Sequence, residues 1–79
     1  MDHEVVVPPT ADGALEVTVR RWLTEAGQPV RKGRDLVEVT TEKIALYIPA
    51  PADGTLAAIG VAAGGKARVG QVVGLVRSE

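Results

Sequence analysis

The residue best suited to chemistry in this chain is Lys43, which lies in a short polar connection, Thr41–Lys43, between two strand-like runs. A lysine amine has an ordinary pKa of about 10.4, and acylation converts it into a neutral amide. No neighbouring residues form a nucleophile–base pair, and no glycine-rich phosphate loop precedes a helix. By themselves these residues leave Lys43 either an ordinary solvated side chain or an amine that another protein acylates, and they predict no catalytic residue.

The connection that holds Lys43 is flanked by predicted strands at 36–40 and 44–48, the second with apolar residues in a period of two. Together they predict a β-hairpin whose tip, Thr41–Lys43, is exposed because its backbone cannot be satisfied inside a core. A helix competes only at 22–26 and 57–63, where the runs are short and bounded by glycine. The remaining predicted strands are 4–7, 17–23, 56–61 and 72–76.

An internal repeat gives the larger architecture. Residues 17–39 align without gaps on residues 54–76, and the matched glycines indicate repeated turns with unusual backbone angles. The identical pairs are Thr18 with Thr55, Ala26 with Ala63, Gly27 with Gly64, Arg31 with Arg68, Gly33 with Gly70, and Val39 with Val76. Two such halves bury their apolar faces only by packing together. We therefore expect an all-β fold: a flattened β-barrel or sandwich of two antiparallel, roughly four-stranded sheets with pseudo-two-fold symmetry.

The other side chains that attract notice have structural interpretations. Lys32 and Lys66 lie in turn-like segments and are predicted to be ordinary surface lysines. Trp22 and Tyr47 are predicted to be partly buried scaffold. His3 has no second histidine or any cysteine near it, so no metal site is expected.

Composition narrows the class of protein further. The 79 residues predict one domain, 1–79, with its core within 4–77. There is no cysteine for a disulfide scaffold, and with a net charge of -1 and no basic stripe, nucleic-acid binding is not expected. No apolar run approaches the ~20 residues that span a bilayer, so no membrane partner is expected. No targeting segment is recognised, which favours a bacterial cytoplasmic or mitochondrial matrix-like location.

Several segments in one register resemble a known family. Glu38–Ile44 is similar to the lipoylation site of the acyltransferase components of 2-oxo acid dehydrogenase complexes, and Gly27–Gly33 and Ile48–Gly54 resemble the flanking turns of that lipoyl domain. The resemblance covers about residues 4–77. The family usually has aspartate and alanine around the lysine, where this chain has Glu42 and Ile44, and glycine is common at the position of Val17.

The resemblance implies a non-catalytic acyl-carrier domain, part of a dihydrolipoamide acyltransferase. Lys43 would hold covalent lipoate and shuttle acyl groups and reducing equivalents between active sites, with Thr41, Glu42 and Ile44 forming the context that partners recognise. The implied partners are a 2-oxo acid decarboxylase or dehydrogenase component, dihydrolipoamide dehydrogenase, the acyltransferase core and a lipoate-attaching enzyme. Discrimination among them is expected in loops beside the tip, including 8–14.

Three alternatives follow from the same residues. A biotin carrier domain shares the implied fold, but its lysine usually lies between two methionines, and the only methionine here is Met1. An unmodified lipoyl-like structural or interaction module would use the hairpin without acylating Lys43. A stand-alone enzyme is the least favoured, because no catalytic pair is evident.

Overall fold

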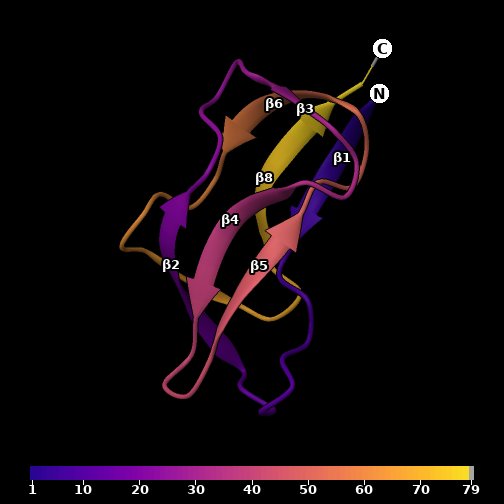
Figure 1. Cartoon of the computed structure of the whole chain (residues 1–79). Helices are drawn as coiled ribbons and strands as arrows, with labels where there is room; N and C mark the ends of the chain where they lie inside the picture. Colours follow the sequence, from indigo (N-terminus) through magenta and orange to yellow (C-terminus); the bar gives the residue numbers. More distant parts are fainter. Residues whose placement is uncertain (79) are drawn as a thin grey trace.

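The computed structural model describes residues 1–78, and every regular element in that range is a β-strand (Figure 1). The strands run antiparallel to their neighbours throughout. Their bounds are β1 Asp2–Val6, β2 Glu16–Trp22, β3 Pro29–Val30, β4 Asp35–Thr40, β5 Ala45–Pro49, β6 Gly54–Ile59, β7 Lys66–Arg68 and β8 Val72–Arg77. The all-β prediction is confirmed, and the two segments in which a helix competed form no helix.

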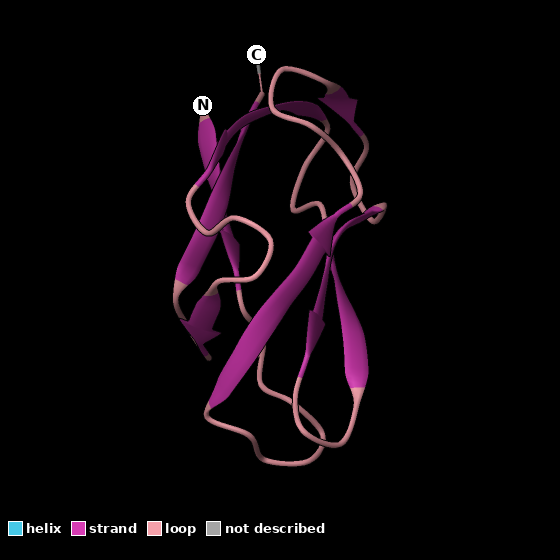
Figure 2. Ribbon diagram, turned by 90° about the vertical axis from the view of Figure 1, so that its left-hand side faces the viewer, coloured by secondary structure: helices cyan, strands magenta, loops and turns pink. Residues whose placement is uncertain are grey.

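The strands form two four-stranded sheets that lie face to face (Figure 2). One sheet has the order β1-β8-β6-β3 and the other has the order β5-β4-β2-β7. Each sheet therefore takes two strands from the first half of the chain, β1–β4, and two from the second half, β5–β8. The halves are interleaved, since neither contains a complete sheet of its own.

The internal repeat is real in three dimensions. The order of each sheet maps onto the other when β1–β4 replace β5–β8, which is the expected pseudo-two-fold arrangement. Gly27 and Gly64 have φ values of 93° and 92°, in the left-handed region that favours glycine. Their amides make reciprocal bonds across the halves, Gly27 N to Leu56 O and Gly64 N to Val19 O, both 2.7 Å.

The core between the sheets is made mostly of valine. Valine is β-branched and packs well on a pleated surface, so a thin core without phenylalanine can still be filled. The buried apolar residues are Val5, Val7, Val17, Val19, Val30, Leu36, Val37, Val39, Ile48, Ala50, Leu56, Ala67, Val73 and Val76. Trp22 is half-buried beside this core, and its indole donates to Val61 O at 2.8 Å. Tyr47 remains 44% exposed.

Two short strands correct the sequence prediction. Segment 30–33 is predicted as a turn, yet Pro29–Val30 forms β3 against β6. Lys66 is predicted to lie in a turn, yet it begins β7, where Thr18 is its partner on β2. Both strands are too short to show a hydrophobic period, and they exist because a neighbouring strand supplies hydrogen bonds. Within 1–78, no helix is long and apolar enough to cross a membrane.

Strands β1 and β8 bring Met1 and Ser78 together at the end of the molecule opposite the β4–β5 hairpin, as both views show for these strands (Figures 1 and 2). The Met1 amino group donates to Ser78 O at 2.8 Å, and Ser78 N donates to Met1 O at 2.9 Å. His3 Nε2 lies 2.9 Å from the Ser78 hydroxyl. The molecule is elongated, with extents of 36 × 20 × 17 Å.

Candidate functional site

The hairpin that presents Lys43 is built on the paired strands β4 and β5. Their last paired residues are Thr40 and Ala45, and the bond from Thr41 N to Ile44 O at 2.8 Å closes the turn. The tip is therefore Thr41–Ile44, one residue longer than predicted, because Ile44 leaves the strand to close it. The predicted lysine on a hairpin tip is confirmed.

The four tip residues divide into an inner and an outer pair. Glu42 and Lys43 are exposed, whereas Thr41 and Ile44 are half-buried. Within the part of the chain that the structure describes, Lys43 forms no ion pair. The amine at the end of its side chain is therefore accessible to a modifying enzyme, as covalent attachment requires. Within the same residues, no group of histidine, cysteine, aspartate or glutamate side chains could hold a metal ion.

The turn is held from inside by the Thr41 side chain. Its hydroxyl accepts hydrogen bonds from the backbone amides of Lys43 and Ile44, each at 3.1 Å. This satisfies two backbone donors that a tight turn would otherwise leave to water.

A second segment reaches the tip from the β1–β2 connection. The Thr41 hydroxyl donates to Asp12 Oδ2 at 2.7 Å. The hydrogen bond from Thr41, with another from Thr10, holds the pKa of the exposed Asp12 carboxyl below its ordinary value of 3.8. Sequence reasoning expected the loop 8–14, which contains Asp12, beside the tip. It missed the contact, because nothing in the local sequence reports which distant element a turn will meet.

An open groove of about 560 Å³ runs beside the hairpin. It lies between the β1–β2 connection, β2 and the tip, and Lys66 contributes from β7. Leu15, on its rim, is 84% exposed. The groove is lined by Asp12, Ala14, Leu15, Glu16, Val17, Thr18, Thr40, Thr41, Glu42, Lys43 and Lys66. The lysine tip therefore lies beside a groove lined by both polar and apolar residues.

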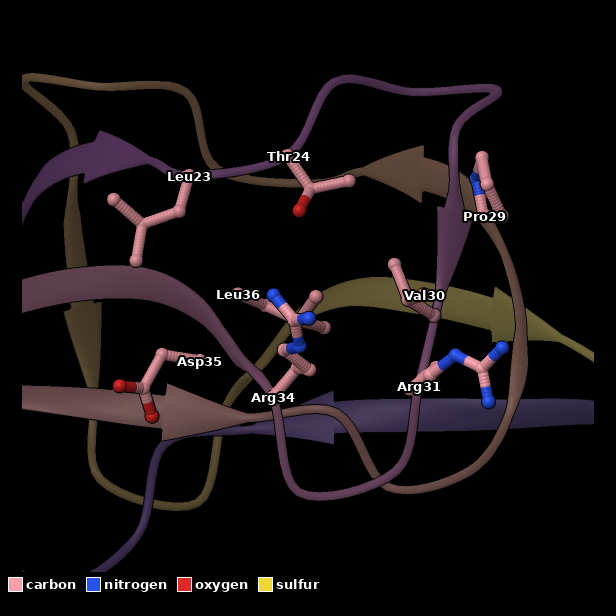
Figure 3. A pocket seen from close by; sticks show the side chains of 8 residues that line it. All are labelled: Leu23, Thr24, Pro29, Val30, Arg31, Arg34, Asp35 and Leu36. Carbon is pink, nitrogen blue, oxygen red and sulfur yellow. The ribbon is translucent and has the colours of Figure 1, made fainter.

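A second hollow of about 590 Å³ lies around the β3–β4 turn, at the far end of β4 from Lys43. Its charged residues are Arg31, Arg34 and Asp35. Figure 3 shows these side chains spread along the turn instead of gathered around one point. All three are exposed. This hollow lacks the convergent polar groups typical of a ligand site, so the hairpin is the better candidate.

Two interleaved four-stranded sheets with an exposed lysine on a connecting hairpin define a lipoyl-type β domain. The chain matches the biotin/lipoyl family model, described as "Biotin-requiring enzyme", over residues 3–76. The chain belongs to this biotin/lipoyl family.

The chain is similar to curated acyltransferase components of two kinds. It is 34% identical, over 94% of its length, to the succinyltransferase component of the 2-oxoglutarate dehydrogenase complex of Rickettsia felis, and covers 18% of that protein. It is 37% identical, over 78% of its length, to the acetyltransferase component of the pyruvate dehydrogenase complex of Acholeplasma laidlawii, and covers 11% of that protein. The chain thus spans less than a fifth of these bacterial relatives.

A solved structure shows the same fold. The lipoyl domain of the 2-oxoglutarate dehydrogenase complex from Azotobacter vinelandii superposes with a TM-score of 0.75, at 24% identity, over 95% of each chain. These comparisons confirm the resemblance to lipoyl domains of acyltransferase components, and with it a carrier-type domain. The specific role of Lys43 stays a prediction.

Proposed function

We propose that this chain is an acyl-carrier domain whose Lys43 bears covalent lipoate. The observation that carries the proposal is the position of that lysine, exposed on the four-residue turn between β4 and β5 in a member of the biotin/lipoyl family. The free amine fits the group, because amide formation needs an accessible nitrogen and removes its charge. Lipoate would supply the acyl-transfer and redox chemistry, while the protein supplies its position.

The chain's own residues set the geometry of this carrier. Strands β4 and β5 give the tip a stiff base, and Thr41 fixes the backbone from which the Lys43 stem departs. The stem then extends the flexible arm that lipoate would continue. Tethering the group in this way replaces free diffusion between active sites by a local search at high effective concentration.

The proposed assembly follows from the curated relatives. We assign the chain, as a single unit with its core within 4–77, to a dihydrolipoamide acyltransferase of a 2-oxo acid dehydrogenase-type complex. Its partners would be the decarboxylase or dehydrogenase component, dihydrolipoamide dehydrogenase, the acyltransferase core and a lipoate-attaching enzyme. The bacterial sources of the relatives support a cytoplasmic location.

The tip residues beside Lys43 would be read by the enzymes that load it. Glu42 is exposed, so its carboxylate can meet a basic partner surface, and Ile44 is half-buried and supports the turn. Both differ from the usual aspartate and alanine of the family, so the proposed recognition tolerates a longer acid before the lysine and a larger apolar residue after it.

The proposal is tested by incubating the domain with a lipoate ligase, ATP and lipoate. The expected product is heavier by one lipoyl group, which fragment mapping places on Lys43. Lys43→Arg keeps the charge and should give no product, whereas Lys66→Arg, in the same groove, should react normally. An unmodified wild-type domain beside a reactive control domain would overturn the lipoyl assignment. A biotinyl group on Lys43 in protein from its native host would do the same.

A further inference from the structure

The β1–β2 connection contacts the lysine hairpin through one short hydrogen bond. The Thr41 hydroxyl lies 2.7 Å from Asp12 Oδ2, a distance typical of a hydroxyl that donates to a carboxylate. The bond joins residues from different parts of the chain, next to the tip that presents Lys43. It is the link on which the inference rests.

The Thr41 hydroxyl uses every hydrogen-bonding position it has. A hydroxyl has one proton to donate and two lone pairs to accept with. Both lone pairs are engaged by the amides of Lys43 and Ile44, so the proton must point elsewhere. The alternative acceptor is Ile44 O at 3.5 Å, which is long for such a bond, so Asp12 fixes the rotation of the hydroxyl.

The Asp12 carboxylate is itself held in place within its loop. Ala14 N donates to Asp12 Oδ1 at 3.2 Å and to Thr10 Oγ1 at 2.9 Å, and Gly13 N donates to Thr10 O at 3.1 Å. Gly13 has a φ of 73°, a conformation that glycine adopts readily. The loop is therefore shaped before it meets the hairpin, and the second carboxylate oxygen is left for Thr41.

The same chemistry occurs once more, at the other end of the molecule. Asp53, in the connection between β5 and β6, accepts a bond from Lys32 N at 2.7 Å and so holds the turn between β3 and β4. Both aspartates are exposed, and each accepts a hydrogen bond from a turn outside its own connection. Asp53 lies at the end of β5 away from Lys43, which makes it a matched control.

We propose that Asp12 is a positioning residue for Lys43: by orienting the Thr41 hydroxyl, it fixes the turn from which the lysine stem departs. This proposal rests on the proposed function, since the position of Lys43 matters for loading. It assigns a definite task to one side chain of the β1–β2 connection. The carboxylate acts through Thr41 and does not touch the amine.

The first measurement is the rate of lipoylation by a lipoate ligase. Asp12→Ala should lower kcat/KM about three- to tenfold, the effect of one hydrogen bond of ordinary strength. Asp12→Asn, which keeps an acceptor oxygen, should restore most of the rate, and Asp53→Ala should react as the wild type does. Asp12→Ala should have no further effect in a Thr41→Val background, because the path through Thr41 is already absent.

The second measurement needs no lipoate. Backbone amide relaxation in the unmodified domain should show lower order parameters at residues 42–44 in Asp12→Ala, with unchanged values there in Asp53→Ala. Unchanged order parameters and rates in Asp12→Ala would overturn the positioning role, as would an undiminished effect in the Thr41→Val background. If the order parameters at residues 42–44 fall as expected but the wild type is never lipoylated, the proposed function fails. The role of the Asp12–Thr41 hydrogen bond in holding the turn would still be supported.

Discussion

The two ends of this molecule are related by pseudo-symmetry, but the strand pairs at the two ends carry different features. At one end, β4 and β5 are joined by the turn Thr41–Ile44, which presents Lys43. At the other end the matching strands β8 and β1 pair in the same way, with Arg77 opposite Asp2, and carry the chain ends instead. The same strand pairing thus carries the Lys43 turn at one end and Met1 and Ser78 at the other.

The support of the two ends differs as well. The hairpin end depends on side chains, with the Asp12 carboxylate and the Thr41 hydroxyl around the turn. The terminal end is held by reciprocal backbone bonds between Met1 and Ser78, with an exposed ion pair between Arg77 and Asp2. The repeated strands therefore supply the frame of both ends, and the side-chain contact from the β1–β2 connection occurs at the hairpin end.

The largest expected effect comes from moving the lysine by one position. In the double variant Glu42→Lys/Lys43→Glu, the tip keeps its composition and charge, but the amine leaves the turn in another direction. We expect the rate of lipoylation to fall about 100-fold, the scale of loss that a small misplacement of a reacting group causes. Ligase kinetics with mass spectrometry measure it. A rate within twofold of the wild type would show that position on the tip is irrelevant.

A second comparison sets Gly54 against its counterpart Val17. A Cβ at position 54 would press on the backbone carbonyl of Arg77, whereas Val17 is fully buried in the other half, so the local backbone must differ at these two positions. Gly54→Ala should destabilise the fold by about 3 kcal/mol through overpacking against backbone. Val17→Ala should cost about 1–2 kcal/mol through lost burial.

Urea unfolding monitored by Trp22 fluorescence measures both changes. A Gly54→Ala variant as stable as the wild type would mean that β6 and β8 separate easily at this point. Positions 54 and 17 would then not differ in whether they accept a side chain.

The third prediction concerns Asp12. Thr41→Val removes the largest cause of its lowered pKa, so the pKa of Asp12 should rise toward 3.8. A lowered pKa in the folded state stabilises the fold above the ordinary value, and this contribution is lost as pH falls through the folded value. The contact to Thr41 should thus be intact at neutral pH and lost only below pH 3.8. Carboxyl-carbon NMR titration measures the change; an unaltered pKa would contradict the contact.

The smallest effect is expected on the outer face of the lysine-bearing sheet. Glu38 is only 8% exposed, and its carboxylate pairs with Arg21 at 2.9 Å, while the matching position in the repeat is Leu75. Glu38→Leu copies the other half. We expect stability to change by less than about 1 kcal/mol, because the Arg21 side chain that loses its partner is 62% exposed and stays solvated by water. Thermal unfolding checks this, and a loss of several kcal/mol would show that the sheets are not interchangeable here.

The hairpin and the two symmetric halves could be predicted from the sequence because their signals are local or repeated. The period-two pattern around Lys43 gave the hairpin, and the matched glycines gave the symmetric halves, down to the nearly equal φ values of 88° and 90° at Gly33 and Gly70. At Gly33 and Gly70 the backbone conformation favours glycine, so the residue type itself indicates the conformation.

What sequence reasoning missed depends on partners distant in the chain. The strand β7 around Lys66 is short and is defined by its pairing with β2, which no local pattern reports. The Asp12–Thr41 bond depends on the path of an irregular loop. Such features become visible only when the sheets have placed their edges and connections beside one another.

The interleaving of the halves has a consequence for a broken chain. A protease cut after Lys43 would separate β1–β4 from β5–β8, yet each sheet would still contain strands of both fragments. The two pieces should stay entwined in a native-like complex, and neither should fold when alone. The exposed tip is therefore a place where the covalent chain can be interrupted while the architecture persists through fragment complementation.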